Sequence, residues 1–417
     1  MITDSASAAL SETPRVRSLA VISLGVGALL LVVSACVVVT FLVVPFLLRQ
    51  DALAVNTAVL SIAAILIVYG ALLILIGRAL EQDKLRAPFR LPAPYWILGA
   101  FFLVLILGQI ILVVDAAPAY LFPLWHVLAS LLFPLAALAY ATQQVDFVST
   151  RSVLAQFAWG GLVTIALALV LELVIGGFLA ILALLGLAVV LGPDEIAELL
   201  RALRTVPTDT QRIGEIVLRE PLSALIAGGT ALTLVVILVP LLEELLKGAG
   251  AAILIVRRTR SGSVPTRGNV LLWGLAAGAG FAFSENMLNG QGTLNNANGL
   301  TGIWAGAMIL RAGTTMMHLV ATATVAIGWY QALVEHKLIR LPLLLLVAVL
   351  MHAIWNSAAL LLAGVSASTG AGTRLADFSV LLGALVLGLL AFLFVGCLFW
   401  LRALLQWARR SADSTTP

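Results

Sequence analysis

The side chains with the greatest chemical potential are ionisable or strongly polar groups placed inside long apolar segments in the second half of the chain. They fall on four successive segments and are Glu243, Glu244 and Lys247, then Glu285, then His318, then His352 and Asn356. A charged group at the centre of a membrane-spanning helix costs about 2.5–3.5 kcal/mol on insertion scales. Groups on four successive segments must therefore compensate one another in one polar cavity, which marks a functional site.

The spacing of these residues on helices indicates which of them can meet. Glu243 and Glu244 precede Lys247 by four and three positions, so either carboxylate can pair with the ammonium on one helix face. Adjacent helical residues point about 100° apart, so one glutamate can face the cavity while its neighbour turns to another helix. His318 and Thr322 share a face in the same way, as do His352 and Asn356, because each pair is four residues apart.

These residue types suit the activation of water, by either of two routes. In the first, a glutamate is the general base and His, Asn356 or Lys247 stabilise the oxyanion or orient the reacting groups. In the second, Glu285, His318 and His352 bind a divalent metal such as zinc, and a carboxylate of Glu243 or Glu244 is the base. The HExxH and HxxEH motifs are absent, which excludes a zincin-type helix.

The composition indicates the elements that must hold these residues. Of 417 residues, 62% are hydrophobic and 11% are charged, with a mean hydropathy of +1.11. Such values exclude a soluble globular enzyme, two cysteines exclude a disulfide scaffold, and a net charge of +4 requires no nucleic acid. We predict an all-α, polytopic transmembrane bundle of about ten spans, which are 19–43, 55–77, 95–114, 120–142, 156–190, 222–256, 269–289, 302–331, 341–363 and 378–402.

Basic residues gather in alternate connections, which predicts the orientation of the spans. They are Arg78, Lys84, Arg86 and Arg90; Arg257, Arg258, Arg260 and Arg267; Lys337 and Arg340; and Arg402, Arg409 and Arg410. By the positive-inside rule these connections are cytoplasmic, and so are both termini. The connection 193–221 mixes six acids with four arginines and leucines at helical spacing, so we expect an amphipathic extracytoplasmic connector there.

The four motifs in this order resemble the PrsW family of intramembrane proteases, within a superfamily that also holds CAAX prenyl endopeptidases and bacteriocin-immunity proteins. The resemblance rests on Glu243-Glu244-x-x-Lys247, Gly280-Phe281-x-x-x-Glu285-Asn286, His318-x-x-x-Thr322 and His352-x-x-x-Asn356. Glu285 stands where CAAX-type members carry histidine. Leu242 stands where many PrsW proteins carry a third glutamate, which leaves the identity of the base open. The resemblance implies cleavage of membrane-protein substrates, of which an anti-sigma factor is the best known, in the bacterial cytoplasmic membrane.

The expected division of the chain follows from the spans and the motifs. Residues 1–18 form a cytoplasmic tail, 19–192 the N-terminal helices, 193–221 the connector, 222–364 the PrsW-like core, and 365–417 the last helix and tail. The expected partners are a membrane-protein substrate and the lipid bilayer, with no nucleic acid, and the oligomeric state is left open. Two alternatives remain: a proton- or ion-coupled transporter, because buried acids and histidines also form proton relays, and a non-catalytic scaffold or immunity-type protein.

Overall fold

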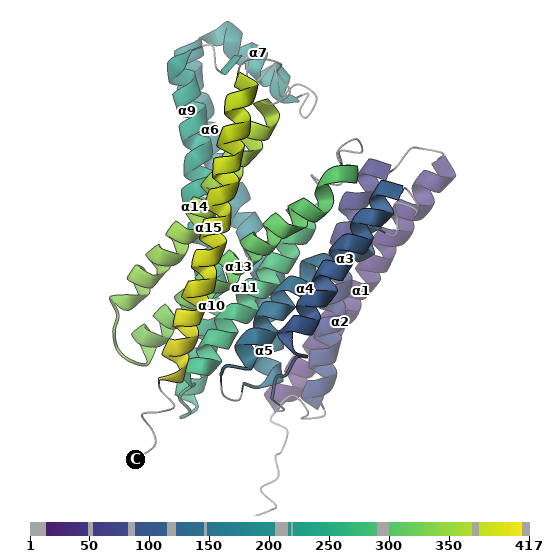
Figure 1. The fold of residues 1–417 in the computed structure, drawn as a ribbon, viewed down its shortest axis with the longest axis vertical. Helices are drawn as coiled ribbons and strands as arrows, with labels where there is room; N and C mark the ends of the chain where they lie inside the picture. Colours follow the sequence, from purple (N-terminus) through teal and green to yellow (C-terminus); the bar gives the residue numbers. More distant parts are fainter. Residues whose placement is uncertain are drawn as a thin grey trace, which may run out of the picture.

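The chain folds into an all-helical bundle, as the sequence predicts (Figure 1). The computed structural model describes residues 14–48, 53–81, 88–114, 122–145, 148–204, 216–217, 220–289, 300–368 and 375–410. Within these residues no strand forms, and β pairing is limited to one bridge between Pro88 and Ser149. Helices are expected because a segment surrounded by hydrocarbon must satisfy all of its backbone hydrogen bonds internally.

The helices follow the ten predicted spans closely. Their bounds are α1 Pro14–Leu48, α2 Leu53–Glu81, α3 Pro94–Val114, α4 Phe122–Thr142, α5 Thr150–Ala158, η3 Trp159–Thr164, α6 Ile165–Leu191, α7 Pro193–Arg204, α9 Pro221–Leu232, η4 Thr233–Leu238, α10 Val239–Arg260, α11 Arg267–Asn289, α13 Leu300–Leu333, α14 Arg340–Ser368 and α15 Leu375–Arg409. The elements η3 and η4 are single π-helical turns.

Eight of the ten predicted spans are long and apolar enough, within the described residues, to cross a membrane. The other two are α11 and α13, which carry Glu285, Arg311 and His318. Nearly every residue of α11 is buried by other helices. A helix enclosed in this way faces protein in place of lipid, so it needs less hydropathy than a helix at the surface of the bundle.

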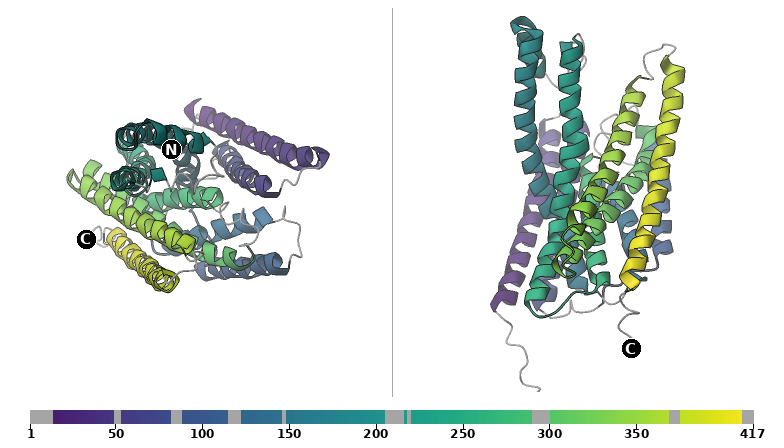
Figure 2. Two further views of the ribbon diagram at one scale, coloured as in Figure 1. Left: turned by 90° about the horizontal axis from the view of Figure 1, so that it is seen from above. Right: turned by 90° about the vertical axis from the view of Figure 1, so that its left-hand side faces the viewer.

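Two of the spans are composite helices that contain the π turns. The segment Thr150–Leu191 runs through η3 for 42 residues, and Pro221–Arg260 runs through η4 for 40 residues. The turn η4 ends just before Pro240, whose missing N–H and ring disturb the preceding helical turn. Figure 1 and Figure 2 show α6, α9 and α7 extending together beyond most of the bundle.

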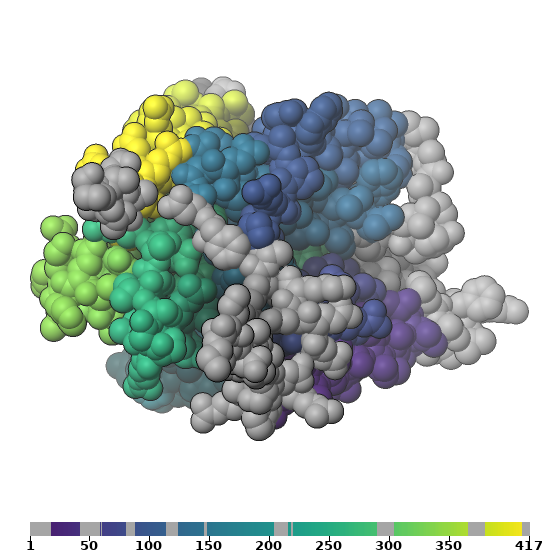
Figure 3. All heavy atoms as spheres, turned by 90° about the horizontal axis from the view of Figure 1, so that it is seen from below, coloured from purple at the N-terminus to yellow at the C-terminus, as the bar shows by residue number. Residues whose placement is uncertain are grey.

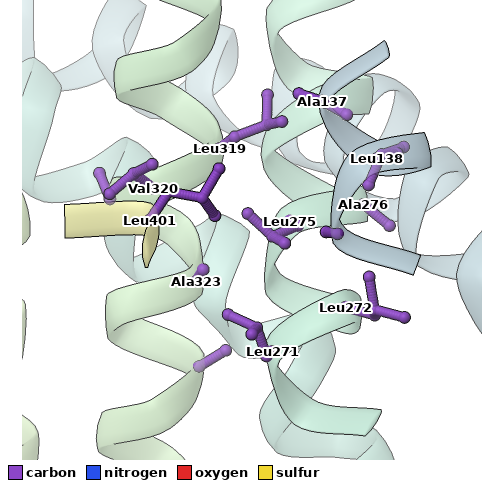
Figure 4. Packing of buried hydrophobic residues seen from close by; sticks show 14 of the residues in the cluster. Ala137, Leu138, Leu271, Leu272, Leu275, Ala276, Leu319, Val320, Ala323 and Leu401 are labelled. Atoms are coloured by element: carbon purple, nitrogen blue, oxygen red, sulfur yellow. The ribbon is translucent and has the colours of Figure 1, made fainter. Parts of the chain in front are cut away.

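The helix α11 lies at the centre and sets the position of its neighbours. Figure 4 shows leucines and alanines of α11 between α13 on one side and α4 on the other, with Leu401 of α15 close by. Gly278 allows the backbone of α13 to approach at His318, since a Cβ there would lie 2.5 Å from the His318 carbonyl oxygen. This close contact holds two of the motif-bearing helices at fixed depth.

One end of the bundle carries the connections that are rich in basic residues. The helices α1 and α14 begin there, and α10 and α15 end there (Figure 1). Figure 3 looks onto this end, where the connection from α10 to α11, the turn between α13 and α14 and the end of α15 share one face. That this face is cytoplasmic remains a prediction from the charges.

The predicted connector 193–221 is described in part. Its first half is the helix α7, which has acidic residues in its first turn. Leu199 packs with Leu187 of α6 and with Ile216, whereas Leu200 and Leu203 are exposed. Residues 205–215, 218 and 219 lie outside the described part, as do residues 1–13 of the predicted tail.

Candidate active site

The four motif-bearing helices α10, α11, α13 and α14 bring their ionisable side chains together, although these lie up to 109 positions apart between Glu243 and His352. Glu244, Lys247 and His318 are fully buried. Glu243 and His352 retain small exposed fractions of 8% and 3%. The fold therefore brings these side chains together in one buried polar cluster, as the sequence predicts.

The carboxylate of Glu244 is held from three sides. Its Oε1 lies 2.5 Å from Lys247 Nζ and 3.0 Å from His352 Nδ1. Its Oε2 accepts a hydrogen bond of 3.3 Å from Thr322 Oγ1. A carboxylate with this many charge-assisted and neutral donors is well compensated and rigidly oriented.

The neighbouring carboxylate of Glu243 is less constrained. Its Oε2 lies 3.3 Å from Lys247 Nζ and 3.8 Å from His352 Nε2, and both distances exceed those at Glu244. Glu243 is also slightly exposed, whereas Glu244 is fully buried. The two glutamates thus occupy different environments, which agrees with the 100° divergence expected on a helix.

Lys247 connects α10 to α13 at the centre of the cluster. Its Nζ lies 3.0 Å from His318 Nδ1 and 4.0 Å from the centre of the Phe281 ring, in addition to its contacts with both glutamates. The rings of His318 and His352 meet edge to face at 4.8 Å. A single buried ammonium therefore contacts side chains from three of the four helices.

Glu285 contacts the ring of His318 at Nε2, the nitrogen that does not face Lys247. Its Oε2 is 2.6 Å from His318 Nε2, and its Oε1 is 3.4 Å from Arg311 and accepts a hydrogen bond of 2.9 Å from Asn289. Arg311 was not among the predicted site residues. The sequence does carry a signal for it, because a charged residue seven positions before His318 lies on the same face of α13.

Asn356 is turned away from the carboxylates. Its Nδ2 donates to the carbonyl oxygen of Val235 at 3.1 Å. Val235 belongs to the π turn η4, where the wider backbone path changes the usual helical pairing. The structure therefore places Asn356 as a link between α14 and η4, and a role near the reacting atoms remains a prediction.

The N-terminal helices hold α11 on both sides of Glu285. Ser284 donates to the Gly161 carbonyl of η3 at 2.7 Å, and Tyr69 of α2 donates to the Gly280 carbonyl at 2.9 Å. His126 of α4 lies 3.1 Å from the carbonyl oxygen of Asn286. Through these contacts the second, fourth and fifth spans help to position α11, which the motif pattern alone did not indicate.

Four buried side chains form a group that can hold a metal ion. Glu243, Glu244, His318 and His352 each offer one ligand atom, and these atoms lie within 4.8 Å of one another. Two carboxylates and two imidazoles form a donor set that suits zinc or a similar divalent ion. Glu285, which the sequence favoured as a ligand, is not in this group and lies 2.6 Å from His318 Nε2, a contact of the kind by which carboxylates orient histidine rings.

Comparison with known proteins identifies the chain. Searches against curated proteins and against solved structures return no match. Residues 149–389, more than half of the chain, match the family described as PrsW family intramembrane metalloprotease. This match starts in the connection before α5, so it also includes the fifth predicted span, beyond the motif region. With the membrane-spanning helices and the buried Glu/His cluster, it shows that the chain belongs to the PrsW family of intramembrane metalloproteases.

Proposed function

We propose that this peptidase cleaves membrane-embedded or single-pass membrane proteins and that Glu243 is the base that activates water. The observation that carries the proposal is the unequal environment of the two adjacent glutamates. Glu244 is fixed by Lys247, His352 and Thr322, whereas Glu243 has longer contacts and remains slightly exposed. A general base must reach the proton that it removes. The carboxylate with fewer and longer contacts is therefore the better candidate.

The other residues orient and compensate this base. Glu244 holds Lys247 and the His352 ring in place through short contacts. His318 is oriented by Glu285, which is in turn compensated by Arg311. The cationic side chain of Lys247 and the imidazole of His352 are the donors nearest to Glu243, so they are placed to stabilise negative charge that develops on a substrate carbonyl.

The metal that the family description implies fits this donor set. Of the four residues, Glu244, His318 and His352 would hold it, which leaves Glu243 free to act as the base. When bound, a divalent ion polarises a carbonyl and lowers the pKa of a bound water. The sequence-based set of Glu285, His318 and His352 remains the alternative, and it differs in making Glu285 a direct ligand.

The substrate class follows from where the site lies. The cluster is enclosed by helices that cross the bilayer, so a substrate must present its backbone within or at the edge of the membrane. A single-pass protein meets this requirement most simply, because its one helix need not be separated from other helices of the substrate. An anti-sigma factor is one candidate of this kind, and the resemblance to the family suggests it.

The proposal is tested by comparing membrane fractions from cells that carry the wild-type protein or the Glu243→Gln variant. We expect one single-pass protein to accumulate uncleaved in the variant. The matched control is Glu335→Gln, since Glu335 lies in the turn between α13 and α14 and pairs with Arg267 and Lys337, outside the Glu/His cluster. Identical cleavage patterns in wild-type and Glu243→Gln cells, with both proteins inserted at equal levels, would contradict the proposal.

A further inference from the structure

A cavity lies at the basic end of the bundle, away from the Glu/His cluster. It has a volume of about 1000 Å³ and separates the α1–α2 hairpin from α5 and α10. Most of its wall is apolar and comes from α1, α2, α5, η3 and α10. The helix α1 contributes Leu19, Ile22 and Val26, and α2 contributes Leu73, Ile76 and Leu80.

Three arginines also line this cavity. Arg257 and Arg258 lie in the last turn of α10, and Arg151 lies in the first turn of α5. Arg258 is fixed in place, because its guanidinium donates to Asn269 Oδ1 at 3.0 Å and lies 5.1 Å from the Trp273 ring. Among the described residues of the lining there is no aspartate or glutamate, so the charge that these residues carry is positive.

The serine hydroxyls in the same wall are largely engaged within the protein. Ser23 donates to the Leu73 carbonyl at 2.8 Å, and Ser152 donates to the Ser149 carbonyl at 2.9 Å. Polar recognition in this cavity therefore rests on the arginines. An apolar wall that joins a group of arginines matches a molecule with hydrocarbon chains and an anionic head.

We propose that this cavity binds an anionic phospholipid. The phosphate lies against Arg151, Arg257 and Arg258, and the acyl chains lie along the apolar faces of α1 and α2. Charge complementarity supports an anionic lipid over a zwitterionic one, because the described lining supplies three arginines and no carboxylate for a choline or ethanolamine group. Basic pockets between helices on the cytoplasmic side are typical sites of this kind, and the positive-inside rule predicts that side here.

Such a lipid also connects the α1–α2 hairpin to the active site. The helix α1 packs mainly on α2, so the cavity occupies the space where α1 would otherwise contact α10. Arg257 lies ten residues after Lys247 on α10. A lipid bound to Arg257 thus contacts the helix that carries Glu243, Glu244 and Lys247.

The test measures lipid retention by the purified full-length protein in detergent, with native mass spectrometry. The probes are phosphatidylglycerol and phosphatidylcholine with identical acyl chains. We expect wild-type protein to retain phosphatidylglycerol preferentially. The exposed Arg257→Gln variant should lose about fivefold in phosphatidylglycerol affinity, the usual contribution of one basic residue near an anionic lipid. Ala155→Phe, which fills the cavity, should reduce retention of the same lipid.

The matched control is Arg260→Gln, an exposed arginine one turn beyond Arg257 that does not line the cavity. It should bind phosphatidylglycerol as the wild type does. Equal retention of the two lipids by wild-type protein would overturn the proposal. So would a loss in Arg257→Gln without a loss in Ala155→Phe that is folded by circular dichroism, because that pattern indicates a surface charge effect.

Discussion

The ammonium of Lys247 lies 3.0 Å from Nδ1 of His318. Lysine has only donors, so Nδ1 is the acceptor and a neutral His318 carries its proton on Nε2, which points at Glu285 Oε2 2.6 Å away. Both ring nitrogens are therefore engaged while Lys247 stays in this position. The ammonium also contacts Glu243 and Glu244, so it lies against three of the four residues that could ligate a metal.

This relationship predicts that Lys247 opposes metal binding. We expect Lys247→Met to bind zinc at least about tenfold more tightly, because like charges a few ångströms apart in a partly buried site repel by several kcal/mol. Metal content and zinc titration of the purified protein measure the effect independently of cleavage. Lys337→Met, at an exposed lysine outside the cluster, is the control. An unchanged or weaker zinc affinity in Lys247→Met would contradict the prediction.

The two glutamates should respond differently to amidation. We expect Glu243→Gln to reduce cleavage at least about 100-fold, the lower range of what a general base supplies, with little change in thermal stability. Glu244→Gln should reduce cleavage as strongly and also lower stability by about 1–3 kcal/mol, because donors that it satisfies are fully buried. Cleavage assays and thermal unfolding in detergent separate the two effects. Full activity in Glu243→Gln would exclude it as the base.

Metal removal tests the ligand group directly. We expect a strong chelator to abolish cleavage and added zinc or another divalent ion to restore it. His352→Ala should lower both the metal content and cleavage, since His352 belongs to the four-residue group. Activity that persists in protein shown to be free of metal would favour a mechanism that depends on the glutamates alone.

The depth of the site can be predicted from helix rise. Arg257 follows Glu244 by 13 residues and Glu285 follows Arg267 by 18, or roughly 20 and 27 Å at 1.5 Å per residue. With about 30 Å of hydrocarbon and basic residues at the cytoplasmic headgroups, the cluster lies between the midplane and the outer boundary. We expect cleavage near the outer end of the substrate's span.

Thiol labelling tests this placement. Cysteines beside Glu285 and His318, introduced after replacement of Cys36 and Cys397, should react with a membrane-impermeant reagent that is added from the outside. A cysteine in the connection between α10 and α11 should react only from the cytoplasmic side and serves as the control. Labelling of the cysteines beside Glu285 and His318 only from the cytoplasmic side would contradict this placement.

Local sequence rules predicted the ion pairs of the site that lie within a single helix, α10. Lys247 pairs with both Glu243 and Glu244, as the spacing of four and three residues indicated. Contacts between helices were beyond these rules. The pairing of Glu285 with Arg311 and His318 depends on how α11 packs against α13.

The π turns were also beyond prediction, since apolar runs of 35 residues give no periodicity signal for one widened turn. Trp159–Thr164 contains two glycines, and its Gly161 carbonyl accepts the hydrogen bond from Ser284. Asn356 was predicted beside the reacting groups from its spacing to His352. Its contact with Val235 depends on η4, which the spacing could not reveal.

The π turn η4 rotates one half of its composite helix relative to the other about the helix axis. A π turn accommodates one extra residue, so the faces of α9 are offset by about 100° from those that a continuous α-helix would give. This offset lets α10 direct Glu243, Glu244 and Lys247 at α13 and α14 while α9 directs its own apolar face at α6. Deletion of a single residue from Thr233–Leu238 would restore the α-helical phase. The two faces could then no longer both meet their partner helices.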